Sequence, residues 1–73
     1  MTNTEMLEEL IRQKGIKKSF LADKLGVTRQ TFDSYLKNRS EFRVGQVNIL
    51  CEVLGIEDPA IKEAVFFAAN GAL

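Results

Sequence analysis

Apolar side chains recur at intervals of three and four residues along most of the chain, which is the spacing of one face of an α-helix. No stretch alternates apolar and polar residues for long enough to indicate a β-strand. We therefore expect an all-α fold. The predicted helices cover Thr4 to Lys14, Lys18 to Leu25, about Arg29 to Lys37, about Val44 to Leu54, and about 59–69.

The same spacing predicts which side of each helix faces the core. In the second and third helices, Leu21, Ala22 and Leu25 share one face, and Phe32 and Tyr35 resume it after a glycine. These two short helices must therefore meet closely. The inner faces expected elsewhere are Leu7, Leu10 and Ile11 in the first helix, Val44, Val47, Leu50, Cys51 and Leu54 in the fourth, and Ile61, Ala64, Val65 and Ala68 in the fifth.

Three glycines mark predicted helix ends. Gly15, Gly26 and Gly55 are each followed by a branched apolar residue, and an apolar residue stands five positions before that one. This arrangement is typical of the Schellman motif, in which the glycine takes a left-handed conformation that other residues adopt at a steric cost. The chain can thus turn sharply after three of its helices.

Capping residues mark three of the predicted helix starts. Thr2 and Glu5 have the spacing of a capping box, and Thr28 can accept a hydrogen bond from a free amide of the third helix. Asp58 precedes Pro59, and a proline is well tolerated at the first helical position.

The 73 residues are enough for one domain, 1–73, with a modest core, so a partner chain would help its stability. No apolar run approaches the length of a membrane span, and the first residues are acidic rather than basic, unlike a secretion signal. A single cysteine cannot form an internal disulfide. We therefore expect a cytoplasmic protein.

The net charge is zero, but it is unevenly distributed. Residues 1–11 contain three glutamates and no basic residue, whereas residues 12–43 contain nine basic residues and three acidic ones. Residues 44–73 contain one lysine and four acidic residues. The central helices are therefore expected to form a basic face between acidic ends, as nucleic-acid binding requires.

The segment LADKLGVTRQTFDSYLKNR resembles the helix-turn-helix of bacterial DNA-binding domains of the Cro and phage-repressor type. The resemblance extends over about residues 7–54. It implies a compact five-helix, lambda-repressor-like domain with its helix-turn-helix at about 18–37, and double-stranded DNA as the partner. It further implies a small transcriptional regulator of the repressor type found in phages and mobile elements.

In that family the third helix enters the major groove. The resemblance points to Arg29, Gln30 and Ser34 as base-reading residues, with Thr31 and Asp33 close by. The chemistry agrees, because arginine can pair with two acceptors of guanine and glutamine with the edge of adenine. The alternative is that these are ordinary solvent-facing residues of a helix's first turns.

The family meets the sugar-phosphate strands at the start of the second helix and in the loop after the third. Lys17 and Lys18 replace a capping serine or threonine and a glutamine that are usual there, so the second helix should be weakly capped. Asn38 replaces a usual glycine and tolerates the left-handed conformation. The phosphate contacts implied by the resemblance are Lys17, Lys18, Thr28, Lys37, Asn38, Arg39 and Arg43.

Helix five carries Val65, Phe66 and Phe67 in succession, and one helix cannot bury all three against one core. Two interpretations stay open. One phenylalanine packs in the core while the other is partly exposed, or the three residues form the contact of a homodimer.

Other function classes find less support in the sequence. There is no histidine and no glycine-rich phosphate loop, and Cys51 lies on an apolar stripe, so we expect no enzyme activity. We expect no cofactor and no metal, and nothing indicates a small-molecule ligand. The alternative to DNA binding is a helical protein-interaction module that kept the fold and docks through Phe66 and Phe67.

Overall fold

The computed structural model describes residues 1–67, which form five α-helices and, within that range, no strand. The helix starts agree with those expected, the third helix ends one residue earlier, and the expected positions 68 and 69 of the fifth lie outside the described residues. None of the helices in this range is both long and apolar enough to cross a membrane. Their bounds are α1 Thr4–Lys14, α2 Lys18–Leu25, α3 Arg29–Leu36, α4 Val44–Leu54 and α5 Pro59–Phe66.

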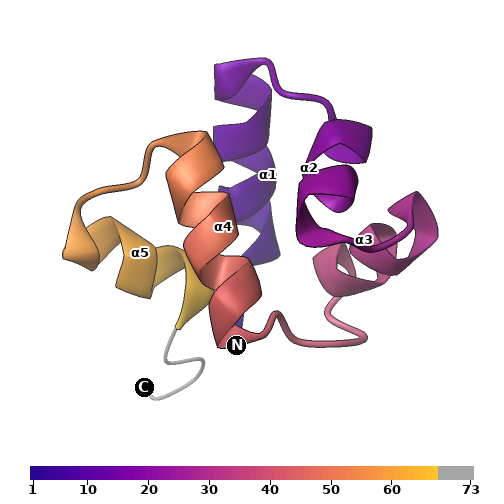
Figure 1. Cartoon of the computed structure of the whole chain (residues 1–73). Helices are drawn as coiled ribbons and strands as arrows, with labels where there is room; N and C mark the ends of the chain where they lie inside the picture. Colours follow the sequence, from indigo (N-terminus) through magenta and orange to yellow (C-terminus); the bar gives the residue numbers. More distant parts are fainter. Residues whose placement is uncertain (68–73) are drawn as a thin grey trace.

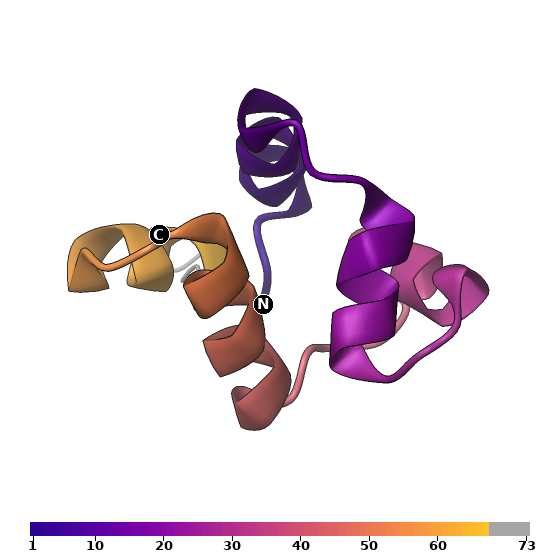
Figure 2. The same cartoon turned by 45° about the horizontal axis from the view of Figure 1, so that its top comes forward.

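Helices α1 and α4 stand at the centre of the molecule. The α2–α3 pair lies on one side and α5 on the other, as both ribbon views show (Figures 1 and 2). Helix α2 packs against α3 and α4, while α1 packs against α4 and α5. The α2–α3 pair is therefore held on a frame made by the other helices, and no other helix of residues 1–67 covers its outer side.

The three glycine turns follow the predicted geometry. Gly15, Gly26 and Gly55 have φ values of 68°, 72° and 71°, in the left-handed region. After each glycine, the next amide donates to the carbonyl five residues earlier, which is the long hydrogen bond of the Schellman motif. These bonds are Ile16 N–H to Ile11 O at 3.3 Å, Val27 N–H to Ala22 O at 3.0 Å and Ile56 N–H to Cys51 O at 2.8 Å.

The start of α1 differs from the prediction. Asn3, not Thr2, caps the helix, because its side-chain oxygen accepts from the Met6 amide at 3.1 Å. Thr2 is instead buried. The backbone amide of Asn3 donates to the Val65 carbonyl at 2.6 Å and so ties the start of the chain to α5. The predicted Thr2–Glu5 capping box is therefore wrong, since asparagine one position later is an equally good cap.

The core agrees with most of the predicted inner faces, but three positions are wrong. Val44, the first residue of α4, is 70% exposed, because the part of this helix that packs in the core begins at Val47. Ile61 and Ala64 are also exposed, because α5 turns Val65 and Phe66 inward instead. Ala68, the fourth position predicted for this face, lies outside the described residues. The fully buried large side chains are Leu7, Leu21, Phe32, Leu50, Leu54 and Val65.

Candidate nucleic-acid interface

The hinge between α2 and α3 is closed by small residues and backbone hydrogen bonds. Ala22 is buried, and its carbonyl accepts from Val27, whose side chain packs on the core. Gly26 supplies the left-handed residue between them. The hinge angle is thus fixed by backbone geometry and packing, which gives α3 one defined orientation relative to α2.

Helix α3 begins at a hydroxyl cap. The Thr28 side chain accepts from the Thr31 amide at 3.0 Å, and its hydroxyl donates to the Thr31 hydroxyl at 3.0 Å. The predicted cap is confirmed. Phe32, Tyr35 and Leu36 are buried on the inner face of α3, which leaves the opposite face for solvent.

The predicted base-reading residues occupy that opposite face. Arg29, Gln30 and Thr31 are exposed in the first turn, whereas Asp33 and Ser34 are half-buried one turn later. The Ser34 hydroxyl donates back to the Gln30 carbonyl at 3.3 Å. The structure therefore places all five residues on α3, and the three residues of its first turn are more exposed than the two that follow one turn later.

One ion pair runs along this face. The Nε of Arg29 donates to Oδ1 of Asp33 at 3.1 Å, four residues on. Both side chains keep about half of their surface in solvent, at 52% and 41% exposed. The guanidinium is thus aligned along the helix while it remains accessible.

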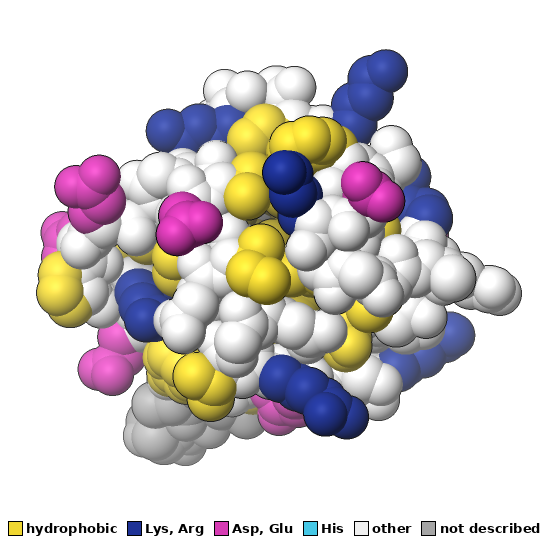
Figure 3. All heavy atoms as spheres, in the orientation of Figure 1, with side chains coloured by type: hydrophobic (Ala, Val, Ile, Leu, Met, Phe, Trp, Pro, Cys, Tyr) yellow, Lys and Arg dark blue, Asp and Glu magenta, His cyan; other side chains and the backbone are white. Residues whose placement is uncertain are grey.

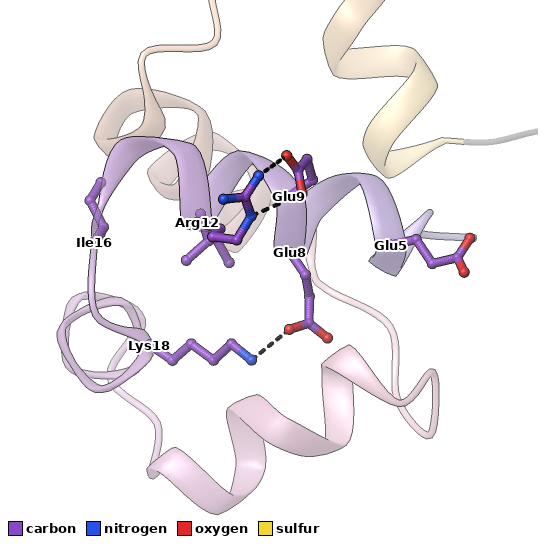
Figure 4. Close-up of a pocket in the computed structure, with 7 residues that line it drawn as sticks. Glu5, Glu8, Glu9, Arg12, Ile16 and Lys18 are labelled. Carbon is purple, nitrogen blue, oxygen red and sulfur yellow. Dashed lines mark hydrogen bonds and ion pairs between the residues drawn. The ribbon is translucent and has the colours of Figure 1, made fainter.

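The entrance to α2 is weakly capped, as expected. Lys17 is the N-cap residue, and its side chain makes no capping hydrogen bond. The ammonium of Lys18, the other cation predicted to meet phosphate here, pairs with the Glu8 carboxylate of α1 at 2.5 Å (Figure 4). Lys17 is the exposed cation here, while Lys18 is held half-buried between two helices.

The Glu8–Lys18 pair sits in an open depression of about 560 Å³ beside α1. Figure 4 shows a second pair on its rim, in which Arg12 donates to Glu9. The hydrogen bond from Arg12 lowers the pKa of the Glu9 carboxyl. The charges around the depression are thus largely paired with one another, which is the arrangement of a solvated ion network.

The loop after α3 carries the remaining predicted phosphate contacts. Asn38 has a φ of 59°, and the Arg39 amide donates to the Ser34 carbonyl at 3.0 Å, so the loop opens with a fourth turn of the Schellman type. Asparagine here does what glycine does at the other three ends. The exposed residues predicted to meet phosphate in this region are Lys37, Asn38, Arg39 and Arg43.

The inner side of the same loop is anchored by two residues that sequence reasoning missed. The Phe42 ring lies 4.6 Å from that of Tyr35. Gln46 accepts from the Arg43 amide at 2.9 Å and donates to the Tyr35 hydroxyl at 3.2 Å. The Arg43–Gln46 spacing of a capping box was a usable signal, although arginine has no acceptor and supplies only the amide.

Charge is divided between the two sides of the molecule. On the face drawn in Figure 3, most acidic side chains lie over α5 and its junction with α4, whereas most basic ones border the half with α2 and α3. The basic stretch of the sequence thus folds onto the half that holds the hinged pair. This agrees with the charge division expected of residues 12–43.

Helix five does not present its three predicted contact residues together. Val65 and Phe66 are buried in the core, and only Phe67 is exposed, at 49%. Of the three residues predicted for a homodimer contact, only Phe67 therefore keeps surface for a partner, because Val65 and Phe66 already pack within the chain. One buried and one half-exposed phenylalanine is the other interpretation that the sequence left open.

Comparison with known proteins gives one family. The model of the Cro/C1-type HTH DNA-binding domain matches residues 6–60, which is more than half of the chain and includes the whole α2–α3 pair. No curated protein and no solved structure shows a significant match.

Proposed function

Because the chain belongs to the family of Cro/C1-type helix-turn-helix DNA-binding domains, we propose that it is a sequence-specific transcriptional regulator that inserts α3 into the major groove. The exposed first turn of α3, set by the Thr28 cap, is the observation that carries the proposal. It offers donors and acceptors on an element narrow enough for the groove.

Base contacts come from the residues on the outer face of α3. Arg29 and Gln30 lie in the first turn, where helices of this docking mode approach base edges, and Thr31 is exposed beside them. Ser34 is half-buried, and its hydroxyl donates to the Gln30 carbonyl of its own helix, so Ser34 contributes less to base recognition. Each good bidentate contact contributes about 1–3 kcal/mol of discrimination between base pairs.

Phosphate contacts flank these residues on both sides. Lys17 and the first amides of α2 form one group, and Lys37, Asn38, Arg39 and Arg43 form the other. The weak cap of α2 supports the first group, because amides without a side-chain partner are free for an anion. Thr28 adds a hydroxyl between the groups. Lys18 forms an ion pair with Glu8, so it contributes to phosphate binding mainly through its positive charge near the surface.

The regulator acts in the cytoplasm by occupying its site, as a small repressor of the phage or mobile-element type does. A homodimer on a two-fold site with half-sites about 34 Å apart follows from the docking mode. In such a dimer Phe67, which directly follows α5, is the one of the three candidate residues that is available for the contact, because it is half-exposed.

Selection of bound duplexes from a randomised pool, followed by titration of the best duplex at several salt concentrations, tests the proposal. A dimer that neutralises about eight phosphates should give a slope of log K against log salt near −7. We expect Arg29→Ala and Gln30→Ala to lower discrimination between sequences. Lys37→Ala and Arg39→Ala should weaken binding to all duplexes alike and make the slope shallower.

A protein-interaction module that has lost DNA binding is the second candidate. It is favoured by the Glu8–Lys18 pair, which takes one cation of the α2 entrance into a contact within the chain. The burial of Phe66 leaves less of α5 for a partner than this candidate needs. If none of the four variants changes binding to any duplex in the pool, the interaction module replaces DNA binding.

A further inference from the structure

The Arg29–Asp33 pair has a specific geometry on the outer face of α3. Asp33 accepts from Nε of Arg29, the nitrogen inside the side chain, at 3.1 Å. Within residues 1–67, the two terminal nitrogens of this guanidinium have no hydrogen-bond partner. The carboxylate therefore holds the guanidinium by its inner edge and leaves its outer fork open.

The outer fork of arginine matches one base better than the other three. Guanine presents two acceptors, O6 and N7, on its major-groove edge, and two parallel N–H groups can reach both. Adenine and cytosine each present a donor there, which would face the guanidinium donors, and thymine presents a single acceptor beside a methyl group. A guanidinium held with its fork outward is thus prepared for guanine.

Asp33 itself is poorly suited to contact a base. It is half-buried one turn further along α3 than Arg29, and one of its oxygens is already engaged. Its negative charge would also face the phosphates of both strands, which opposes binding in general. A residue that costs affinity and touches no base can still contribute by fixing a neighbour.

We propose that Asp33 is a positioning residue that holds the Arg29 guanidinium so that it selects guanine at one position of each half-site. This rests on the proposed DNA binding and names the base that the site reads. Immobilising a flexible side chain on binding costs about 0.5–1.5 kcal/mol. Because the ion pair with Asp33 already restricts the Arg29 side chain in the free protein, this cost does not fall on the binding step.

The alternative role for Asp33 is purely structural. Pairs of opposite charge four residues apart stabilise exposed helices slightly, and Asp33 could do no more than this. The two roles differ in their readout. A structural role changes the stability of the fold, whereas a positioning role changes base preference at one position.

The experiment compares Asp33→Ala, Arg29→Ala and Asp23→Ala with the parent protein, using the selected duplex and its single-base variants. Asp23 is the matched control, because it is an exposed acid of α2 in the same basic stretch and, within residues 1–67, forms no hydrogen bond or ion pair with Arg29. Asp33→Glu serves as the conservative variant, because an arginine and a glutamate four residues apart can also pair.

We expect Asp33→Ala to reduce the guanine preference at one position by about 2- to 12-fold, the equivalent of one side chain's immobilisation cost. Both Asp33→Ala and Asp23→Ala should bind unrelated duplexes more tightly, because each removes a negative charge. Asp23→Ala should keep the preference, Arg29→Ala should abolish it, and Asp33→Glu should retain most of it.

Three results would overturn the inference. A preference that survives Asp33→Ala but is lost in Arg29→Ala leaves Asp33 without a positioning role. A preference for another base at that position, or one unaffected by Arg29→Ala, removes Arg29 as a reader of guanine while DNA binding stands. A parent protein that selects no duplex from the pool rejects the proposed function and the inference together.

Discussion

At the scale of single residues, a side chain can cap the start of a helix only if it has a hydrogen-bond acceptor for the free backbone amides. Thr28 has a hydroxyl that accepts from the Thr31 amide, so α3 begins with its cap filled. Arg43 stands at the same position of α4 but can only donate, so Gln46 completes that end from inside the helix. Two different residue types thus fix the starts of α3 and α4.

The Cys51 thiol should behave as a protected core group. Burial raises its pKa above the ordinary value of 9.0, and the charge of Lys62 opposes this only in part. The folded state therefore favours the protonated thiol, and this stability is present below the unfolded pKa and is lost as the pH rises through the higher folded one.

We expect thiol–disulfide exchange at Cys51 to be slow at pH 8 in the folded protein and fast in urea, because the thiolate is the reactive form. The rate of modification by a chromogenic disulfide reagent measures this. Equal rates in the two conditions would show that the thiol is accessible.

Exposure on α3 was predictable from the sequence, whereas pairing between helices was not. The helical period alone separates Arg29 and Gln30 from Phe32. Glu8 and Lys18 are ten residues apart on two helices, and their contact depends on the distance between α1 and α2. No periodicity in the chain encodes that distance.

At the scale of helices, four helix ends are followed by a residue in the left-handed conformation, which is glycine at three of them and Asn38 at the fourth. The backbone conformation is what these positions require, since a Cβ at Gly26 would meet no atom within 4 Å. The turn is therefore sensitive to the residue's φ preference and insensitive to its size. Such ends could be recognised in the sequence because the signal is local.

Gly26→Ala should lower the free energy of unfolding by about 1–2 kcal/mol, because alanine is strained in the left-handed region. Gly45→Ala is the matched control. Gly45 lies within α4, with open space around it, so alanine there should raise stability by about 0.5–1 kcal/mol. Urea denaturation of both variants should give opposite signs, and the same sign for both would contradict this account.

Lys17→Ser should strengthen the fold and weaken the proposed DNA contact at once. Serine can fill the empty cap of α2, which contributes about 1 kcal/mol of stability. The loss of one cation per protomer should make the salt dependence of DNA binding shallower. Thermal melting and salt titration of the same variant measure the two effects, and a gain in DNA affinity would count against a phosphate contact by Lys17.

At the scale of the whole molecule, an aromatic cluster joins the two halves. Phe42, in the loop after α3, has its ring 6.1 Å from Phe32 of α3 and 6.1 Å from Phe66 of α5, the latter edge-on. The loop that carries the predicted phosphate contacts is therefore supported from α5. The face of α5 could not be predicted from its own period, because Phe66 turns inward to meet a ring more than twenty residues away in sequence.

Phe66→Ala should destabilise the fold by about 3–5 kcal/mol, a large fraction of the stability of so small a domain. Phe67→Ala, at the half-exposed neighbour, should change monomer stability by less than about 0.5 kcal/mol. It should instead weaken self-association if the proposed dimer forms through α5.

Chemical denaturation and sedimentation of both variants separate the two residues. A sedimentation profile of Phe67→Ala that matches the parent dimer would remove Phe67 from the contact. A monomeric parent, both free and on DNA, would remove the dimer itself.

The hydrogen bond from Asn3 to Val65 closes a ring of about sixty residues, and such a long closure is entropically more costly than the short ones within the α2–α3 pair. The hinged pair can form from contacts between close neighbours in the chain, whereas α5 gains this bond only when the first residues arrive. Folding is therefore expected to assemble α2 and α3 early and to seat α5 late. In reverse, we expect α5 to be the first helix to detach and the α2–α3 pair to keep its shape for longest.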